Sequence, residues 1–372
     1  MGGQRLAIGL MSGTSMDGVD VAAIETDGRV VAEFGPTLFR PYSEAERAAI
    51  RVAVAEAPGL VHRADRPAEL VLAERVVTEA HIDAVRTFLE ANGLAAQDVA
   101  VIGFHGQTVH HAPARRLTVQ LGDGLALARA IGVPVVYDFR AADVAAGGEG
   151  APLVPIYHAG LVRRSDLARP VAVLNIGGVA NLTHVGRGDG DEVDLVAFDC
   201  GPGNALVDDW CQTRTGRPVD VDGRAAARGR VDEAVVAALL ADPFFARPAP
   251  KSLDRNAFSS AAVEGMSFED GAATLTAFTA AAIAAGLAML PEAPHTLVVA
   301  GGGAHNPTML AMIAARCGVP VVTATQVGWS TDFLEAQAFA HLAVRHLEGL
   351  PLSFPGTTGV RQAIGGGVLA RA

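Results

Sequence analysis

The order of apolar runs and tight turns at the start of the chain recurs in its second half. In the first forty residues, apolar runs at 6–10, 19–24 and 30–34 alternate with turns, which predicts a three-stranded antiparallel meander. Past the Gly-rich stretch "AAGGEGAPLVP", the segments "RPVAVLNIGGVANLTHV" and "VDLVAFDCGPGN" restart this pattern. Because the two halves share almost no residues, we interpret this as a repeat of architecture and not of sequence.

The segments that follow each meander predict mixed sheets flanked by helices. In the first half we expect strands in "VAVIGFHGQT", "LTVQLGDG" and "VPVVYDF", with helices from Ser43, over 67–92 and over 125–131. In the second half we expect a helix in "NALVDDWCQTRTG", an Ala-rich helix near 271–290, the strands "HTLVVAGGG" and "VPVVTAT", and a helix from Pro307. The predicted fold class is α/β, with two similar lobes, each a mixed β-sheet flanked by helices. We expect one lobe over 1–140 plus about 348–372, and the other over 141–347.

Charge and cysteine usage exclude several classes of partner. The 372 residues carry a net charge of −11 and Lys251 is the only lysine, so no basic stripe could neutralise a nucleic-acid backbone. The N-terminus has no long apolar segment, and we expect apolar stretches to be interrupted before membrane-spanning length. These features predict a cytoplasmic protein with no membrane or nucleic-acid partner. The cysteines Cys200, Cys211 and Cys317 match no disulfide framework or zinc spacing, and we expect them reduced and buried.

The first turn, in "GLMSGTSMDGVD", has the small residues of an anion-binding loop but lacks the lysine of the G-x-x-x-x-G-K-[ST] pattern. A strand, and not an obvious helix, follows it. An ordinary polar hairpin is the alternative, since Asp-Gly is a common turn signal. Two lobes that each offer such a turn to a cleft between them describe the actin, hexokinase and Hsp70 type of ATPase fold. We therefore predict phosphate binding by the residues Ser12, Gly13, Thr14, Ser15, Met16, Asp17, Gly18, Val19 and Asp20.

Two further strand ends carry candidate site residues. Asp199 follows the apolar "LVAF" and precedes "CGPGN", which is typical of a cleft position, but it could equally cap the next helix. Gly301, Gly302 and Gly303 end a predicted strand and precede a helix. They could let a phosphate or adenosine approach the backbone, or they could serve only close strand–helix packing.

Polar residues after the strands of the first half, with one on a late helix, are candidates for a substrate site. His105 and Gln107 lie in "FHGQT", Asp138 and Arg140 in "VYDFR", and Glu335 in "DFLEAQAFAHL". An arginine suits a carboxylate ligand, although Asp138 and Arg140 could instead form a structural ion pair, and Glu335 could be a solvated helix residue. The remaining histidines show no convergent ligand spacing, so we assign no metal ligands from the protein.

Several long motifs together resemble one family. "GLMSGTSMDGVD", "FHGQT", "VYDFRAADVAAGGEGAPLVP", "NIGGVANLT", "FDCGPGN" and "AGGGAHNP" resemble, in this order and over about residues 8–347, the anhydro-N-acetylmuramic acid kinases of bacterial cell-wall recycling. The resemblance implies an enzyme that uses ATP and Mg²⁺ to convert 1,6-anhydro-N-acetylmuramic acid, with addition of water across the anhydro bridge, to N-acetylmuramic acid 6-phosphate and ADP. It also implies peptidoglycan recycling and a homodimer.

The resemblance assigns roles to some of the candidates. Asp199 becomes the general base for the water that attacks C1, and Gly301, Gly302 and Gly303 go to the nucleotide. Two alternative functions are compatible with the same residues. One is a simple sugar kinase of the same fold, which would deprotonate a free hydroxyl and add no water. The other is a non-enzymatic sugar or nucleotide sensor, for which no added interaction segment is visible.

Overall fold

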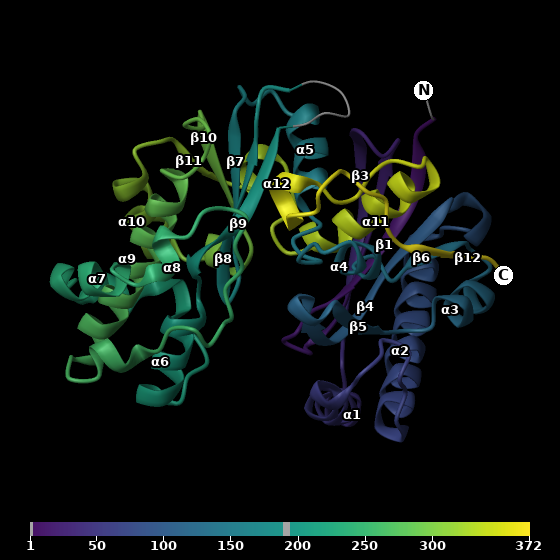
Figure 1. The fold of residues 1–372 in the computed structure, drawn as a ribbon, viewed down its shortest axis with the longest axis horizontal. Coiled ribbons are helices and arrows are strands. Elements are labelled where there is room, and N and C mark those ends of the chain that lie inside the picture. The colour runs from purple at the N-terminus through teal and green to yellow at the C-terminus, as the bar shows by residue number, and fades with distance from the viewer. Residues whose placement is uncertain (1–2, 189–193) are drawn as a thin grey trace. The chain divides into compact units, whose positions relative to one another are not determined.

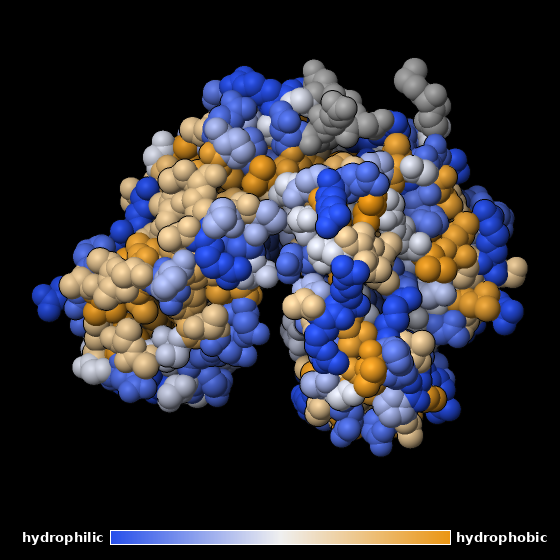
Figure 2. All heavy atoms as spheres, viewed as in Figure 1, coloured by the Kyte–Doolittle hydropathy of each residue, from blue (hydrophilic) through white to orange (hydrophobic). Residues whose placement is uncertain are grey.

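The computed structural model describes residues 3–188 and 194–372. The chain forms two compact units. Unit 1 comprises Met1–Arg164 and Phe333–Ala372, and unit 2 comprises Ser165–Asp332. On the face drawn in Figure 2, hydrophilic residues (blue) and hydrophobic residues (orange) are interspersed over both units, as is ordinary for a protein surface.

The sheet of unit 1 begins with the predicted meander, in which β1, β2 and β3 pair antiparallel. It continues on the other side of β1 with the parallel strands β4 and β6 and the antiparallel edge strand β12, in the order β12-β6-β4-β1-β2-β3. A further strand, β5, pairs antiparallel with the second half of β4. The strands of unit 1 are β1 (Arg5–Ser12), β2 (Gly18–Thr26), β3 (Val31–Pro41), β4 (Val101–Ala112), β5 (Leu117–Leu121), β6 (Val135–Tyr137) and β12 (Val368–Ala370).

Local sequence signals fix the helices of unit 1. Ser43 and Glu46 form a reciprocal capping box at the start of α1, and Gly93 ends α2 in the left-handed conformation with φ of 61°. One core lies between the sheet and α1, α2 and α3. The helices of unit 1 are α1 (Glu44–Glu56), α2 (Ala68–Asn92), α3 (Gly124–Ile131), α4 (Ala141–Ala145), α5 (Pro155–Arg164), α11 (Leu334–Leu347) and α12 (Pro355–Thr358).

The lobe boundaries expected from the sequence differ from the observed units. Residues 141–164 and 333–347, which we assigned to the second lobe, belong to unit 1. For residues 333–347 the reason is the packing of α11 on the sheet: a Cβ added at Gly9 of β1 would collide with the Ala336 carbonyl, and one at Gly103 of β4 with the Phe339 carbonyl. The two glycines therefore let the helix backbone lie directly against the sheet. No local sequence signal reports such a contact between segments more than 200 residues apart.

The sheet of unit 2 repeats the strand order of unit 1. Its order β11-β10-β7-β8-β9 corresponds to β6-β4-β1-β2-β3, with an antiparallel meander followed by parallel strands. This correspondence confirms the predicted α/β class with two similar lobes. The strands of unit 2 are β7 (Val171–Ile176), β8 (Val179–Val185), β9 (Leu195–Pro202), β10 (Thr296–Ala300) and β11 (Val321–Thr323).

The core of unit 2 is built around α9. Of the helices in the described residues, α9 alone is long and apolar enough to cross a membrane by length and composition, contrary to our expectation that every apolar stretch is interrupted. It is mostly buried inside the unit, where it contacts α6, α7, α10 and β9, as a core helix does. The thiols of Cys200 and Cys211 are free and buried, and that of Cys317 is free and partly buried. The helices of unit 2 are α6 (Ala205–Thr215), α7 (Glu233–Leu240), α8 (Pro243–Ala246), α9 (Phe268–Leu287) and α10 (Pro307–Cys317).

Candidate functional site

The first candidate loop is shorter than the sequence indicated. The turn between β1 and β2 spans 13–17, whereas Gly18, Val19 and Asp20 already belong to β2, in which Asp20 pairs with Met11. Val19 is fully buried in the core of unit 1, so its side chain cannot reach a ligand. The side chains that the turn leaves exposed are those of Thr14, Ser15 and Asp17.

Buried polar groups hold this turn in place. Ser12 Oγ donates to the Gly106 carbonyl at 3.1 Å, and Gln107 Nε2 donates to the Gly13 carbonyl at 3.0 Å. Within the turn, Ser15 Oγ donates to Asp17 Oδ1 at 2.8 Å. Gln107 is fully buried and anchors the turn through Nε2, while its Oε1 has no hydrogen-bond partner within the described residues. The motifs "GLMSGTSMDGVD" and "FHGQT" thus form one structural unit.

His105, Arg140 and Glu335, all proposed for the substrate site, lie close together in unit 1. Arg140 donates from Nε and Nη2 to His105 Nε2, at 3.2 and 3.0 Å, and from Nη1 to the Gly150 carbonyl at 2.8 Å. Burial and the Arg140 charge hold the pKa of His105 well below its usual range, so His105 is neutral. Burial raises the pKa of Glu335, and the nearby Arg140 guanidinium opposes that rise. Three elements therefore contribute to this cluster: β4 supplies a neutral imidazole, the segment after β6 supplies a cation, and α11 supplies an acid.

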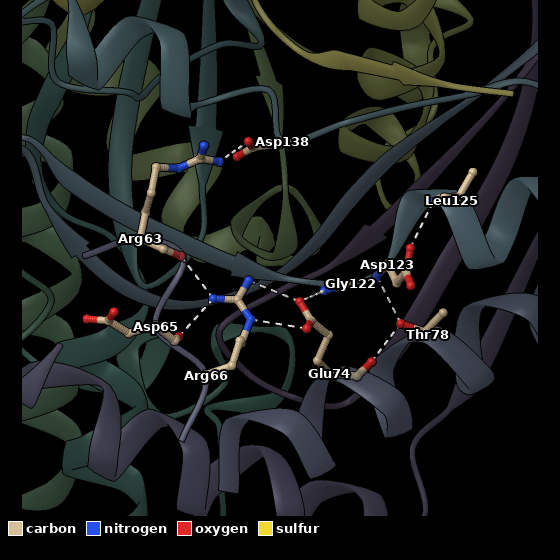
Figure 3. Close-up of polar contacts among 9 residues, drawn as sticks. All are labelled: Arg63, Asp65, Arg66, Glu74, Thr78, Gly122, Asp123, Leu125 and Asp138. Carbon is tan, nitrogen blue, oxygen red and sulfur yellow. Dashed lines mark hydrogen bonds and ion pairs between the residues drawn. The ribbon is translucent and has the colours of Figure 1, made fainter. Parts of the chain in front are cut away.

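Asp138 pairs with Arg63 and not with Arg140, so the alternative of a structural ion pair between Asp138 and Arg140 is not observed. Asp138 follows β6 with a positive φ of 56°, a conformation in which aspartate is tolerated better than most residues. Burial raises the pKa of its carboxyl group, and Arg63 opposes that rise. Figure 3 shows the Arg63 guanidinium directed at this carboxylate.

Arg63 and Asp138 belong to a polar pocket of about 240 Å³ in unit 1. His105 also lines it, together with Tyr137 and Gln120. The pocket lies where the parallel pairing of β4 with β6 ends, at Phe104 and Tyr137, and the carboxyl ends of parallel strands are the usual place for ligands. Sequence reasoning missed Arg63, Tyr137 and Gln120. The strand "LTVQLGDG" and the arginines of "VHRADRP" were visible, but nothing in the sequence shows that they approach Asp138.

The loop that carries Arg63 is held by Arg66. Arg66 makes two hydrogen bonds to the Glu74 carboxylate, at 3.1 and 3.0 Å, and donates to the carbonyls of Arg63 and Asp65 at 2.9 and 3.0 Å (Figure 3). The hydrogen-bond donors of Arg66 are thus used to hold this loop. By contrast, the Arg63 guanidinium has one partner within the described residues, Asp138, and its side chain is 55% exposed, so it retains donors for a ligand.

In unit 2, Asp199 lies in β9 opposite Asn181 of β8. Its Oδ2 accepts a hydrogen bond from the Leu253 amide at 2.8 Å, and its own amide donates to the Lys251 carbonyl at 2.9 Å. Burial raises the pKa of Asp199 to about 6, although the Leu253 amide lowers it. The helix-capping alternative is not observed, because α6 begins after Asn204 without a side-chain cap. A carboxylate with a pKa near neutrality suits a general base.

The three glycines after β10 divide between the two interpretations that the sequence left open. A Cβ at Gly301, where φ is 76°, would collide with the Asn175 side chain, and one at Gly303 would overlap Ile176. These two glycines are therefore explained by packing. Gly302 is exposed, and a Cβ there would lie 3.4 Å from Asn204 Nδ2, with nothing else within 4 Å. Gly302 alone among them leaves room for a ligand.

Two sequence comparisons with known proteins agree along almost the whole chain. A family model described as anhydro-N-acetylmuramic acid kinase matches residues 5–371. A protein of that name from Rhodopseudomonas palustris (strain BisB18) is 56% identical over 366 residues, which cover 98% of this chain and 99% of the relative. Another from Azorhizobium caulinodans is 58% identical over 368 residues and 98% of both chains. Among solved structures, component A of the (R)-2-hydroxyglutaryl-CoA dehydratase of Acidaminococcus fermentans aligns with a TM-score of 0.49 and 14% identity, over 92% of this chain and 98% of that one.

Proposed function

Because this chain belongs to the anhydro-N-acetylmuramic acid kinase family, we propose that it converts 1,6-anhydro-N-acetylmuramic acid, ATP and water to N-acetylmuramic acid 6-phosphate and ADP. It is a phosphotransferase with an alcohol group as acceptor. The sensor alternative is thereby excluded.

The chemistry of the anhydro sugar requires a base. Its O6 is bonded to C1, so no free 6-hydroxyl exists until that bridge opens. In the proposed reaction, a water oxygen bonds to C1 as the C1–O6 bond breaks, and O6 takes the γ-phosphoryl group as the bond to the ADP oxygen breaks. The proton released by the water goes to the base.

Asp199 carries this proposal. Its pKa of about 6 allows it to be ionised at neutral pH and still bind a proton. The Leu253 amide occupies Oδ2, while Oδ1 accepts no hydrogen bond within the described residues. One oxygen is thus held in place and the other is left for the water.

The candidate nucleotide contacts fit a phosphate chain. A Cβ at Gly13 would meet only Ser15 within 4 Å, with Oγ at 3.4 Å and the backbone nitrogen at 4.0 Å, so the missing side chain leaves space beside the exposed Thr14 and Ser15 hydroxyls. Gly302 offers similar room in unit 2. When bound, Mg²⁺ would neutralise charge on the transferring phosphoryl group. No cluster of three or more His, Cys, Asp or Glu residues that could hold a metal lies within residues 3–188 and 194–372, so most of its ligands would be phosphates and water, with Asp17 as a candidate carboxylate.

For the sugar we propose the pocket of unit 1 that Arg63 and Asp138 line, together with the neighbouring His105, Arg140 and Glu335. The lactyl group of the sugar is a carboxylate and calls for a cation. Arg140 already donates from three nitrogens, whereas Arg63 retains free donors. We therefore assign the lactyl carboxylate to Arg63 and a supporting role to Arg140. We also propose that the protein acts in peptidoglycan recycling in the cytoplasm. We propose further that it forms a homodimer, which sedimentation velocity can measure.

The experiment that tests the reaction is mass analysis of product formed in water enriched in heavy oxygen. We expect one heavy oxygen at the anomeric hydroxyl and none at the phosphoester oxygen. Asp199→Asn should bind ATP and sugar but lose turnover by roughly 10²–10⁴-fold, because an amide cannot take the proton. A control with N-acetylmuramic acid 6-phosphate alone corrects for spontaneous exchange. Unlabelled anomeric oxygen would favour the simple sugar kinase, and near-normal turnover of folded Asp199→Asn would remove this residue as the base.

A further inference from the structure

The single lysine of the chain is buried without an acidic partner. Lys251 Nζ donates to the Phe244 carbonyl at 3.0 Å and to that of Phe245 at 3.5 Å, both in α8, and lies 4.5 Å from the centre of the Phe244 ring. No ion pair to it occurs within the described residues, and the residue is only 6% exposed. A buried ammonium group without a counter-charge is costly, so its position requires an explanation beyond packing.

The backbone next to Lys251 is the one that holds Asp199. The Lys251 carbonyl accepts the Asp199 amide at 2.9 Å, and the Leu253 amide, two residues on, donates to Asp199 Oδ2 at 2.8 Å. The segment 251–253 therefore makes hydrogen bonds to both the main chain and the side chain of Asp199. This segment has no helical or strand structure of its own, so its position depends on its anchors.

We propose that Lys251 is a positioning residue, whose ammonium group ties the segment 251–253 to the end of α8 and thereby keeps the Leu253 amide on the Asp199 carboxylate. Lys251 acts through the backbone. The influences on the pKa of Asp199 are burial, which raises it, and the Leu253 amide, which lowers it. The Cys200 thiol is a titratable group beside Asp199, and burial raises its pKa so that it stays neutral.

This inference rests on the proposed function only for its catalytic consequence. The pKa of Asp199 can be measured directly by carbon NMR of labelled aspartate carboxyl groups, with Asp199→Asn to assign the signal. Lys251→Met keeps an apolar side chain of similar length but removes the Nζ donors and the contact of Nζ with the Phe244 ring, and we expect the pKa of Asp199 to rise by roughly one pH unit. Lys251→Arg retains the charge and the donors and should restore the pKa to nearly its original value.

Arg247→Met is the matched control. Arg247 is exposed and also lies over the Phe244 ring, at 5.8 Å, but it makes no hydrogen bond to the segment 251–253. Its loss removes a nearby charge without removing the tether, so the pKa of Asp199 should not move. Should Lys251→Met fail to fold, Lys251→Gln removes the charge with a smaller change in polarity. An unchanged pKa of Asp199 in a folded Lys251→Met or Lys251→Gln variant would overturn the inference.

The pH profile of kcat/KM separates this inference from the proposed function. If both hold, the acidic limb in Lys251→Met moves upward with the NMR pKa, while activity at high pH is largely kept. If the NMR pKa moves and the acidic limb does not, Lys251 positions Asp199 as inferred but Asp199 is not the base.

Discussion

At the scale of single residues, the pocket of unit 1 distinguishes two arginines that look alike in the sequence. Arg66 is fixed by Glu74 and by two carbonyls, while Arg63 meets only Asp138 at the pocket. The two arginines therefore differ in role because they differ in hydrogen bonding. Arg66 shapes the loop, and Arg63 is available to bind.

We predict that Arg63→Met raises the KM for the anhydro sugar by roughly 10- to 100-fold, because a hydrogen-bonded partner of a carboxylate is lost. The kcat should change little, since the lactyl group takes no part in the bonds that break. Steady-state kinetics with the natural sugar and with the analogue that lacks the lactyl group measure this. The variant should differ from the original enzyme only on the natural sugar, and Arg75→Met, on the exposed surface of α2, is the control. An equal loss on both sugars would contradict the assignment.

At the scale of elements, helices and strands followed from local signals, whereas contacts within the site did not. The capping box at Ser43 and the stop at Gly93 are encoded within a few residues, so the predicted helices agree with α1 and α2. Asp199 meets Leu253 across 54 residues of sequence, and Arg63 meets Asp138 across 75. Such pairs arise only when the sheets have formed, and no periodicity or turn signal specifies them.

The turn between β1 and β2 permits a clean test of nucleotide binding. Gly13→Val should fold, because its side chain meets only Ser15 nearby, but it should weaken ATP binding by roughly tenfold or more by blocking the approach of a phosphate to the backbone. Calorimetry with a non-hydrolysable ATP analogue measures this. Gly59→Val, with nothing within 4 Å of its added Cβ, is the matched control in the same unit. Equal ATP affinity in the two variants would exclude the turn from the nucleotide site.

At the scale of the whole molecule, the largest burial-induced pKa shifts of histidines lie in unit 1, whereas two aspartates with strongly raised pKa values lie in unit 2. In unit 1, burial lowers the pKa of His81 to about 4 and that of His158 to about 3, and holds those of His105 and His341 well below the usual range. In unit 2, burial raises the pKa of Asp199 and of Asp208 to about 6. The units should therefore respond differently to acid.

The sign of the pH dependence of stability follows from which state, folded or unfolded, binds more protons. An unfolded histidine has a pKa of about 6.5. Between about pH 6.5 and 4, the unfolded form of unit 1 therefore binds protons that the folded form does not bind. The stability of unit 1 falls as the pH falls. Each fully buried histidine contributes up to about 1.4 kcal/mol per pH unit, and the raised pKa values of Asp138 and Glu335 oppose this in part. In unit 2, the folded state holds protons on Asp199 and Asp208 that the unfolded state releases, so acid favours folding there, with His184 opposing.

We predict that acidification from pH 7 to pH 5 lowers the protection of unit 1 against amide hydrogen exchange while that of unit 2 is kept or increased. Mass spectrometry of peptides from α2 and α9, corrected for intrinsic exchange rates, reports on each unit separately. His81→Met should reduce the pH dependence in α2 by about one proton, because His81 is a fully buried histidine of that helix. Equal loss of protection in both units would mean that the buried histidines do not govern the acid response of this molecule.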